Sequence, residues 1–397
     1  MRFRTNLFFL QHLMVFVLTL LAINGVASAQ TIQSHLPAET ALHDGTWLEW
    51  PHHHTYGVQY RDRLEPTWVS MTQALIRSER VDIVAYNSTE KTRITNVLTA
   101  AKVPLSNVRF ILSPTDDVWV RDNGPIFVFD RSGKLKITDW GFNGWGLKAP
   151  HTLDNTIPIA VASSLGVARI DLNTTILEGG AVAVDGNGVF MATRSSILEP
   201  HRNPGLTQAK MQSILTEHFG VTKFIWLDGY PGGSQDITDA HIDGFAQFGP
   251  NGTLVTMSQS DLNYWGLSTK DINTVYNATD VRGVRYSLKQ LPLTSGDVVT
   301  TYGVDLGVKG SYVNYYVANT VVLIPMYADP NDAAAKRILQ NLFPGRSVIG
   351  IDCRNLYAEG GMIHCVTQQQ PMMNSIAKPA AMVMEAIRSS VFQEKPK

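Results

Sequence analysis

Short apolar runs bounded by polar residues alternate with segments of helical periodicity along most of the chain. Residues 81–85 (VDIVA) and 107–112 are rich in apolar and β-branched side chains, which favours strands. Between them, residues 90–102 carry apolar side chains at helical spacing. The same periodicity predicts helices over 207–219, with Thr207 as the N-cap, and over 332–343.

Pairs of strands separated by short turn sequences predict antiparallel hairpins. Asp185-Gly-Asn-Gly188 and Gly249-Pro-Asn-Gly252 are strong turn signals, and a third turn is expected at Arg131-Ser-Gly133. The hairpin strands predicted around these turns span 126–129 and 135–140, 182–184 and 189–192, and 245–248 and 253–257. Further strands are predicted over 224–227, 320–325 and 347–351.

This recurrence of strand, turn, strand, helix and strand predicts an α/β protein made of repeated supersecondary units around one axis. A doubly wound open sheet is the competing α/β arrangement. The hairpins weigh against it, because they require antiparallel strand pairs.

The first residues of the chain have the character of a signal peptide. A positively charged start is followed by a nearly unbroken apolar run over 13–23, and Ala27-Ser28-Ala29 fits the small-x-small cleavage pattern. The run is short for a transmembrane anchor. We therefore predict a signal peptide over 1–29 and a single domain over 30–397, in a soluble protein exported to the periplasm or secreted.

Composition narrows the classes of partner. A net charge of −1 without a basic run gives no reason to expect nucleic acid. No stretch after the signal peptide is long and apolar enough to span a bilayer, so no membrane partner is expected. Cys353 and Cys365 are the only cysteines and could form one disulfide in an exported chain. The run His52–His54 is interpreted as a loop open to adventitious metal binding, because no carboxylate or cysteine stands at useful spacing.

Four stretches hold polar residues that packing alone does not require; they are 115–125, 177–181, 236–245 and 359–371. In the first, three aspartates surround a Trp-x-Arg-Asp sequence that ends at Asp122. A capped turn would explain one of these acids, whereas a site could use a carboxylate to bind a planar cation in bidentate fashion. In the second, Glu178 precedes two glycines, which also suits an exposed glutamate at a β-bulge.

His241 and Asp243 are two residues apart, which places both on one face of a strand. There they could divide proton transfer and cation binding, although a metal site is a rival with only two ligands in view. Adjacent residues of an extended backbone point to opposite faces, so His364 is a poor base for Cys365. A reactive thiol needs a nearby base or a lowered pKa, and His241 is the better candidate for that partner.

Taken together, these stretches resemble the agmatine deiminase and bacterial peptidylarginine deiminase family of the guanidino-group-modifying superfamily. The resemblance runs from Gly45-Thr-Trp-Leu-Glu-Trp-Pro51 to Gln368-Gln-Gln-Pro371. Its most specific segments are 117–125, 139–146, 177–180, 239–243, 311–319 and 360–371, in the family's order. The resemblance implies a pentein fold, a five-bladed α/β propeller of ββαβ units with pseudo-fivefold symmetry.

The resemblance also implies roles for five residues. Cys365 is expected to attack the guanidinium carbon, while Asp122 and Asp243 hold the guanidinium nitrogens. His241 is expected to protonate the departing ammonia and then to activate water. Glu178 is expected to pair with His241 or with the guanidinium. No metal, nucleotide or redox cofactor is implied.

Three further residues are implied in substrate binding. Trp119 would wall the substrate, Trp145 would lie against it, and Asn314 would support the substrate or the site. The peptidylarginine branch carries two arginines that read a C-terminal carboxylate, and Gly144 and Gly146 stand at those positions here. The resemblance therefore favours agmatine as the small-molecule guanidino substrate, with N-carbamoylputrescine as product.

Other functions stay open at this point. A peptidylarginine or free-arginine deiminase is the runner-up, an amidinotransferase is a same-fold alternative, and a non-catalytic protein that binds guanidines or polyamines belongs to another class. The sequence also leaves the oligomeric state open, a homo-oligomer included.

Overall fold

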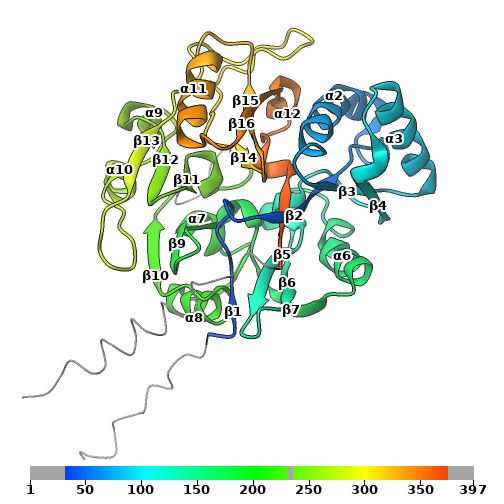
Figure 1. Ribbon diagram of the computed structural model, residues 1–397. Coiled ribbons are helices and arrows are strands. Elements are labelled where there is room, and N and C mark those ends of the chain that lie inside the picture. The colour runs from blue at the N-terminus through cyan, green and yellow to red at the C-terminus, as the bar shows by residue number, and fades with distance from the viewer. Residues whose placement is uncertain (1–31, 231–235, 374–397) are drawn as a thin grey trace, which may run out of the picture. The chain divides into compact units, whose positions relative to one another are not determined.

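Hydrogen bonds between strands join the chain into five separate sheets within the residues that the structure describes (Figure 1). This computed structural model describes residues 32–230 and 236–373. The predicted signal peptide over 1–29 lies outside the described residues. The doubly wound open sheet is thereby excluded, because one continuous sheet would be required.

The first three sheets contain the following strands and main helices. The first sheet contains β17 (Gln368–Pro371), β2 (His43–Glu49), β3 (Arg80–Ala85) and β4 (Val108–Leu112), with helices α2 (Gly57–Leu75) and α3 (Ser88–Ala100). The second contains β1 (Ser34–His35), β5 (Ile126–Asp130), β6 (Leu135–Gly141) and β7 (Ala168–Ile176), with α6 (Ile157–Leu165). The third contains β8 (Ala183–Val184), β9 (Val189–Thr193) and β10 (Lys223–Leu227), with α7 (Arg194–Ile197) and α8 (Gln208–Phe219).

The last two sheets have the same composition of strands and helices. The fourth contains β11 (Ala246–Gly249), β12 (Thr253–Thr256) and β13 (Ser287–Gln290), with α9 (Gln259–Tyr264) and α10 (Thr269–Tyr276). The fifth contains β14 (Tyr316–Val317), β15 (Val321–Met326) and β16 (Ser347–Asp352), with α11 (Asp332–Leu342) and, after it, α12 (Arg354–Ala358).

Each sheet contains the same unit, an antiparallel pair followed by a parallel strand. The antiparallel pairs are β5–β6, β8–β9, β11–β12 and β14–β15, and each second strand pairs in parallel with the strand that follows the intervening helix. A parallel neighbour requires a crossover connection, which the helices provide. The recurrence expected from the sequence is therefore confirmed at the level of the sheets.

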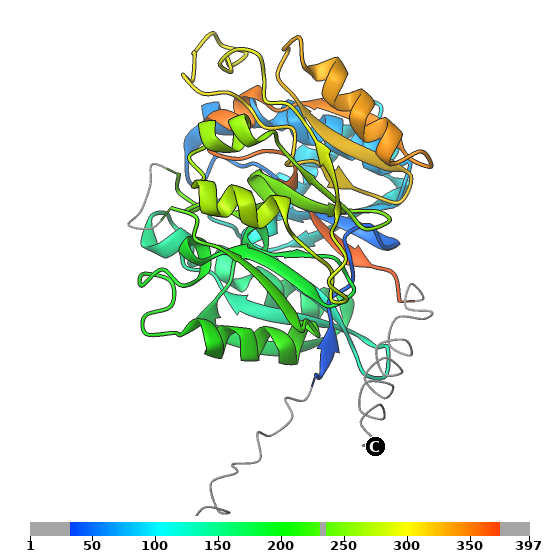
Figure 2. The ribbon, with the colours of Figure 1, turned by 90° about the vertical axis from the view of Figure 1, so that its left-hand side faces the viewer.

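In the first sheet, the antiparallel partner of this unit is a strand from the C-terminal end of the described residues. β17 pairs antiparallel with β2, and β2 pairs in parallel with β3. Figure 1 shows β17, in orange-red, beside β2, in blue. Figure 2 shows helices of the later units on the outer side of their strands.

The pattern of buried residues in each segment matches its position in the fold. Residues 321–325 of β15 are all buried, as expected for a strand covered on both faces. In contrast, α11 buries only Ala335 and Leu339 and leaves its polar face to solvent. No helix of the described residues is both long and apolar enough to cross a membrane.

The three predicted hairpins and the predicted helices are confirmed, with ends that shift by one or two residues. At α8 the cap is confirmed as well, because the Thr207 side chain accepts a hydrogen bond from the Lys210 amide. The expectation of a strand at His241 and Asp243 is wrong. Residues 242–244 form a single 3₁₀ turn, η4, and β11 begins only at Ala246.

Replacing Thr207 with Ala should lower the free energy of unfolding by about 1 kcal/mol, because one N-terminal amide of α8 loses its acceptor. Urea denaturation followed by circular dichroism measures the change. Thr207→Ser keeps the hydroxyl and should remain close to the parent. Equal losses in the Ala and Ser variants would show that the cap is not what stabilises this helix end.

Candidate active site

The polar residues singled out in the sequence come together where the first strands of the repeated units begin. Asp122 lies on α4 (Val120–Asn123), just before β5, and Gly180 lies in η3 (Gly179–Ala181), just before β8. Asp243 lies in η4 (Ile242–Gly244), before β11. Asn314 precedes β14, and Cys365 lies in η5 (His364–Val366), before β17. Equivalent positions of the five units therefore supply one site.

Asp122 is buried and fully hydrogen-bonded. Its Oδ1 accepts a hydrogen bond from the Gly180 amide at 2.9 Å, and its Oδ2 accepts one from Trp145 Nε1 at 2.9 Å. Burial, which outweighs the nearby His241, raises the pKa of Asp122 to about 6. The carboxylate is thus fixed in orientation and ionised at neutral pH.

His241 is held between two carboxylates. Its Nε2 lies 2.8 Å from Glu178 Oε2, and its Nδ1 lies 3.6 Å from Asp122 Oδ1. Burial disfavours the imidazolium, but Asp122, Glu178 and Asp243 outweigh it and raise the pKa of His241 to about 9. His241 is therefore protonated at neutral pH and can donate a proton.

Glu178 is fully buried behind His241. Arg202 Nε donates to both oxygens of Glu178, at 2.7 and 3.0 Å, and Arg202 Nη1 donates to Asp239 Oδ2 at 2.6 Å. Burial alone would raise the pKa of Glu178, but Arg202 and then His241 lower it. Because its oxygens are shared between Arg202 and His241, Glu178 acts on the site through His241.

Asp243 is hydrogen-bonded to a second histidine, His364. His364 Nδ1 lies 2.8 Å from Asp243 Oδ2, and His364 Nε2 lies 3.0 and 2.9 Å from the two oxygens of Glu39. Burial and Arg121 disfavour the imidazolium, yet Glu39 and Asp243 raise the pKa of His364. The Glu39 pKa is lowered to about 2, because His364 and Arg121 overcome the effect of its burial.

Cys365 lies beside Asp243 and Asn314. Its Sγ is 3.7 Å from Asp243 Oδ2, and Asn314 Nδ2 donates to the sulfur at 3.3 Å. Asn314 also accepts a hydrogen bond from the His364 amide at 2.9 Å, which ties the turn of Cys365 to β14. Burial, followed by the charges of Asp243 and Asp122, raises the pKa of the Cys365 thiol well above its usual range.

Gly180 marks the point where these groups converge. A Cβ atom added there would lie 2.5 Å from His241 Nδ1, 2.7 Å from Asp122 Oδ1 and 3.1 Å from Asp243 Oδ2. Only a residue without a side chain fits between the three groups. Gly361 has a similar place near Cys365, where a Cβ atom would lie 2.3 Å from the Trp119 ring. Gly361 therefore lets the backbone pack closely against Trp119 beside Cys365.

A cavity of about 420 Å³ opens onto Cys365 and Asp122. Trp119 and Trp145 line it and meet edge to face, with ring centroids 6.2 Å apart. Asp117 accepts hydrogen bonds from Tyr60 and from Trp119 Nε1, and burial raises the pKa of Asp117 to about 7. The remaining lining residues are Tyr56, Gln59, Arg63, Ala149, Ile237, Thr238, Glu359 and Gly360.

A family model described as Porphyromonas-type peptidyl-arginine deiminase matches residues 35–371. The chain belongs to this deiminase family. An agmatine deiminase of Pseudomonas fluorescens is 32% identical over 361 residues, which cover 85% of this chain and 95% of that protein. An agmatine deiminase of Pseudomonas aeruginosa is 31% identical, again over 85% of this chain and 95% of that protein.

Solved structures of the deiminase family share the mixed α/β fold. A Porphyromonas gingivalis protein assigned as an arginine deiminase superposes with a TM-score of 0.74 at 33% identity, over 86% of this chain and 99% of that chain. The agmatine deiminase of Enterococcus faecalis superposes with a TM-score of 0.73 at 24% identity, over 86% of this chain and 96% of that chain.

Two expectations about the deiminase site need correction. His241 and Asp243 converge because η4 turns sharply between them, and the two do not share a strand face. Likewise, Cys365 and His364 lie in a 3₁₀ turn, so the premise of an extended backbone is wrong. His364 is linked to the site through Asp243. Cys353 and Cys365 are both free thiols, and no disulfide joins them.

Two residues of the site, Arg202 and Glu39, had no signal in the sequence. Arg202 lies in a segment without a motif, and Glu39 precedes β2 by a few residues. Both act as charged partners of site residues rather than as parts of a motif. His364 was discounted on local geometry, although its position beside Cys365 was the one signal that could have found it.

Replacing Asp122 with Asn should make Cys365 react faster with iodoacetamide at pH 8. The aspartate charge raises the pKa of the thiol, so its removal increases the thiolate fraction. Peptide mass spectrometry after timed quenching measures the rate at Cys365, with buried Cys353 as the internal reference. Asp171→Asn, which changes an exposed carboxylate, should leave the rate unchanged. An unchanged or slower rate in Asp122→Asn would show that this charge does not suppress the thiolate.

Proposed function

We propose that the protein hydrolyses a guanidino substrate through a covalent Cys365 intermediate, and that this substrate is agmatine. The observation that carries the proposal is the meeting of Asp122 and Asp243 around Gly180, with Cys365 Sγ 3.7 Å from Asp243 Oδ2. A guanidinium is a planar cation with a fixed fan of donors, so two carboxylates can bracket it beside the sulfur.

The charges of Asp122 and Asp243 make the site unfavourable for a thiolate and favourable for a cation. Asp122 and Asp243 raise the thiol pKa, so little thiolate forms without substrate. A bound guanidinium neutralises these carboxylates, and Cys365 can then lose its proton to water in the cavity. Substrate binding and activation of the nucleophile are coupled in this way.

The first half of the reaction forms a carbon–sulfur bond. The Cys365 thiolate attacks the guanidinium carbon to give a tetrahedral adduct. Protonated His241 gives its proton to one amino group, which leaves as ammonia. The product of this half is an amidino-thioether on Cys365, and His241 is now neutral.

The second half of the reaction restores the enzyme. Neutral His241 takes a proton from water, and the hydroxide attacks the amidino carbon. The carbon–sulfur bond then breaks as the hydroxyl proton of the adduct passes through water to the departing sulfur, which restores the Cys365 thiol and releases a neutral ureido product. In sum, agmatine and water give N-carbamoylputrescine and ammonia, and no redox step is involved.

The choice of agmatine is supported by the charge of the cavity. Among the described residues that line the cavity, Asp117, Asp122 and Glu359 are acidic and Arg63 is the one Lys or Arg. An acidic wall suits a substrate whose second end is an amine. Gly144 and Gly146 provide no cation for a carboxylate, and relatives named agmatine deiminase cover most of the chain.

Arg63 favours a second candidate, deimination of arginine or of a peptidyl arginine. Its guanidinium lies 4.0 Å from the centroid of the Tyr302 ring and borders the cavity, where it could pair with a carboxylate. Arg63→Gln should leave agmatine turnover near that of the parent. If arginine is the substrate, the same variant should instead raise KM for arginine.

Purified protein should release ammonia and N-carbamoylputrescine from agmatine, and Cys365→Ala should lower kcat at least about 10⁴-fold, because no other group can form the thioether. Parallel assays use free arginine and a peptide with C-terminal arginine. Cys353→Ala is the matched control and should retain activity. Equal turnover by Cys365→Ala would refute the nucleophile, and no product from any substrate would favour a non-catalytic binding protein.

The pH dependence of kcat/KM should be bell-shaped. Asp122 must be ionised, so activity should fall as pH drops below about 6, and His241 must be protonated, so activity should fall above about 9. Glu178→Gln removes a charge that raises the His241 pKa, and the alkaline limb should move to lower pH. The control Glu199→Gln should not shift it. An unmoved alkaline limb in Glu178→Gln would contradict the assignment of His241.

We further propose that the five sheets are the blades of an α/β propeller with pseudo-fivefold symmetry. The same strand unit in each sheet, and the site residues at equivalent positions of each unit, support this arrangement. We also propose that residues 1–29 are a signal peptide, that residues 30–397 form one deiminase domain, and that the enzyme is exported. The sequence pattern at Ala27-Ser28-Ala29 supports the export proposal.

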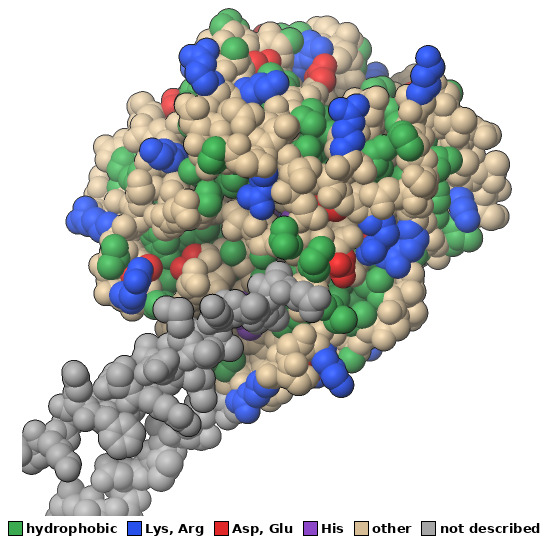
Figure 3. Space-filling model, in the orientation of Figure 1, with side chains coloured by type: hydrophobic (Ala, Val, Ile, Leu, Met, Phe, Trp, Pro, Cys, Tyr) green, Lys and Arg blue, Asp and Glu red, His purple; other side chains and the backbone are tan. Residues whose placement is uncertain are grey.

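The charges on the visible surface fit a small-molecule enzyme. On the face in Figure 3, Lys and Arg side chains are scattered among hydrophobic and uncharged residues instead of forming one patch. A basic patch would be expected on a nucleic-acid-binding face.

A further inference from the structure

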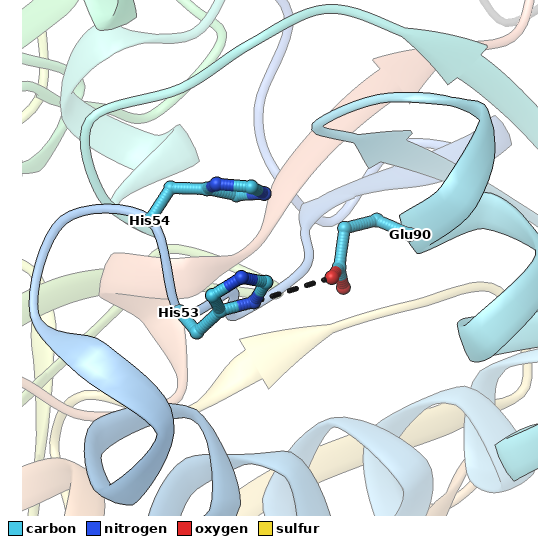
Figure 4. Close-up of side chains that lie close together, drawn as sticks. All are labelled: His53, His54 and Glu90. Atoms are coloured by element: carbon cyan, nitrogen blue, oxygen red, sulfur yellow. Dashed lines mark ion pairs between the residues drawn. The ribbon is translucent and has the colours of Figure 1, made fainter.

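The three consecutive histidines after β2 do not simply form an exposed loop. Figure 4 shows His53 and His54 facing Glu90, which comes from the first turn of α3. One donor atom from each residue lies within 4.8 Å of the other two. Within the described residues this is the only such group of three metal-ligating side chains, and it is separate from the proposed catalytic residues. Because Glu90 lies far along the chain, the sequence spacing did not reveal it.

We propose that His53, His54 and Glu90 bind a divalent transition-metal ion of the zinc class. Two imidazoles and a carboxylate are ligands that zinc accepts, and three protein ligands leave one position for water. Two ligand atoms on a tetrahedral zinc, each about 2.1 Å away, are about 3.4 Å apart. His53 Nδ1 and Glu90 Oε1 are 3.4 Å apart. This pair is therefore spaced as two ligands of one ion, and a ring nitrogen of exposed His54 lies within 4.8 Å of both atoms.

The residues behind the three ligands hold them in place. Arg93 Nε donates to Glu90 Oε2 at 2.7 Å, which leaves Oε1 toward the histidines. The His54 ring stacks on Tyr86, with centroids 3.9 Å apart and an interplanar angle of 18°. His52 Nδ1 accepts a hydrogen bond from the His54 amide at 3.1 Å. Such outer contacts orient ligands in metal sites.

The local charge also favours a cation. Arg93 is shared between Glu90 and Glu65, so two carboxylates face one guanidinium and one negative charge remains. Glu90 is itself buried, and its amide is capped by Asn87, which fixes the carboxylate at the start of α3. His53 and His54 are exposed, so an ion can reach the site from solvent.

The site would join α3 to the segment that forms one wall of the catalytic cavity. The histidines lie at the end of the segment that leads into α2, and Tyr56, Gln59, Tyr60 and Arg63 of that region line the cavity. An ion held by His53, His54 and Glu90 ties this segment to α3. Because an ion that binds only the folded state stabilises it by mass action, metal should raise the melting temperature.

Zinc binding should be measured by isothermal titration calorimetry on untagged protein carrying Cys365→Ala, so that the catalytic thiol cannot bind the ion. One Zn²⁺ per chain is expected. His53→Ala and His54→Ala should each weaken binding at least about tenfold and remove the zinc-induced rise in melting temperature. Both side chains are exposed, so these variants should fold normally.

His201→Ala is the matched control, because His201 is an exposed histidine paired with Glu199 at 2.6 Å in the same way. Its zinc affinity should equal that of the parent. Zinc-soaked crystals should show anomalous density within bonding distance of His53 Nδ1 and Glu90 Oε1. Absence of binding, or binding that survives both His53→Ala and His54→Ala, would overturn the proposal.

Discussion

Burial of negative charge is the constraint on which the site depends. Asp122, Glu178 and Asp243 are all buried, and their charges act on one another. An unpaired buried carboxylate costs several kcal/mol, so each needs a fixed donor or cation. Arg202 and His241 neutralise Glu178, His364 pairs with Asp243, and Asp122 has only neutral N–H donors and His241 at 3.6 Å.

This unequal compensation of the buried negative charges explains why the site favours a cationic ligand. Asp122 remains the least neutralised carboxylate, and its pKa is correspondingly raised by burial. A cationic substrate completes the charge balance, whereas a neutral ligand would leave it unfavourable. The requirement for a rigid, hydrogen-bonded carboxylate also accounts for Gly180, because its amide holds Asp122 and its missing side chain leaves room for the other groups.

Much of the fold could be predicted because its signals are local. Apolar alternation, the turn at Asp185–Gly188 and the cap at Thr207 depend on neighbouring residues, and the structure bears them out. The sequence also singled out Asp122, His241, Asp243 and Cys365, which the fold brings together, because unusual residues are concentrated in the short segments that hold them. The 3₁₀ turns at η4 and η5 were missed, since a single turn has no periodicity and is set by contacts with other units.

The charged residues that pair with the site residues could not be predicted from the sequence, for a related reason. Glu39 and Arg202 are ordinary charged residues in segments without a motif, and only the fold brings them to His364 and Glu178. The same holds for Glu90, which joins His53 and His54 only because α3 packs beside the loop after β2. These parts of the site thus depend on charge pairs between residues far apart in the sequence, which local sequence patterns do not reveal.

The central claim is that Cys365 forms an amidino-thioether with its substrate. Rapid acid quenching of the enzyme during agmatine turnover, followed by intact-protein and peptide mass spectrometry, tests it directly. We expect an adduct on Cys365 with the mass of agmatine less ammonia, which appears before product accumulates and decays as substrate is exhausted. Product formation with no adduct on Cys365 at any quench time, or an adduct on another residue, would exclude Cys365 as the nucleophile.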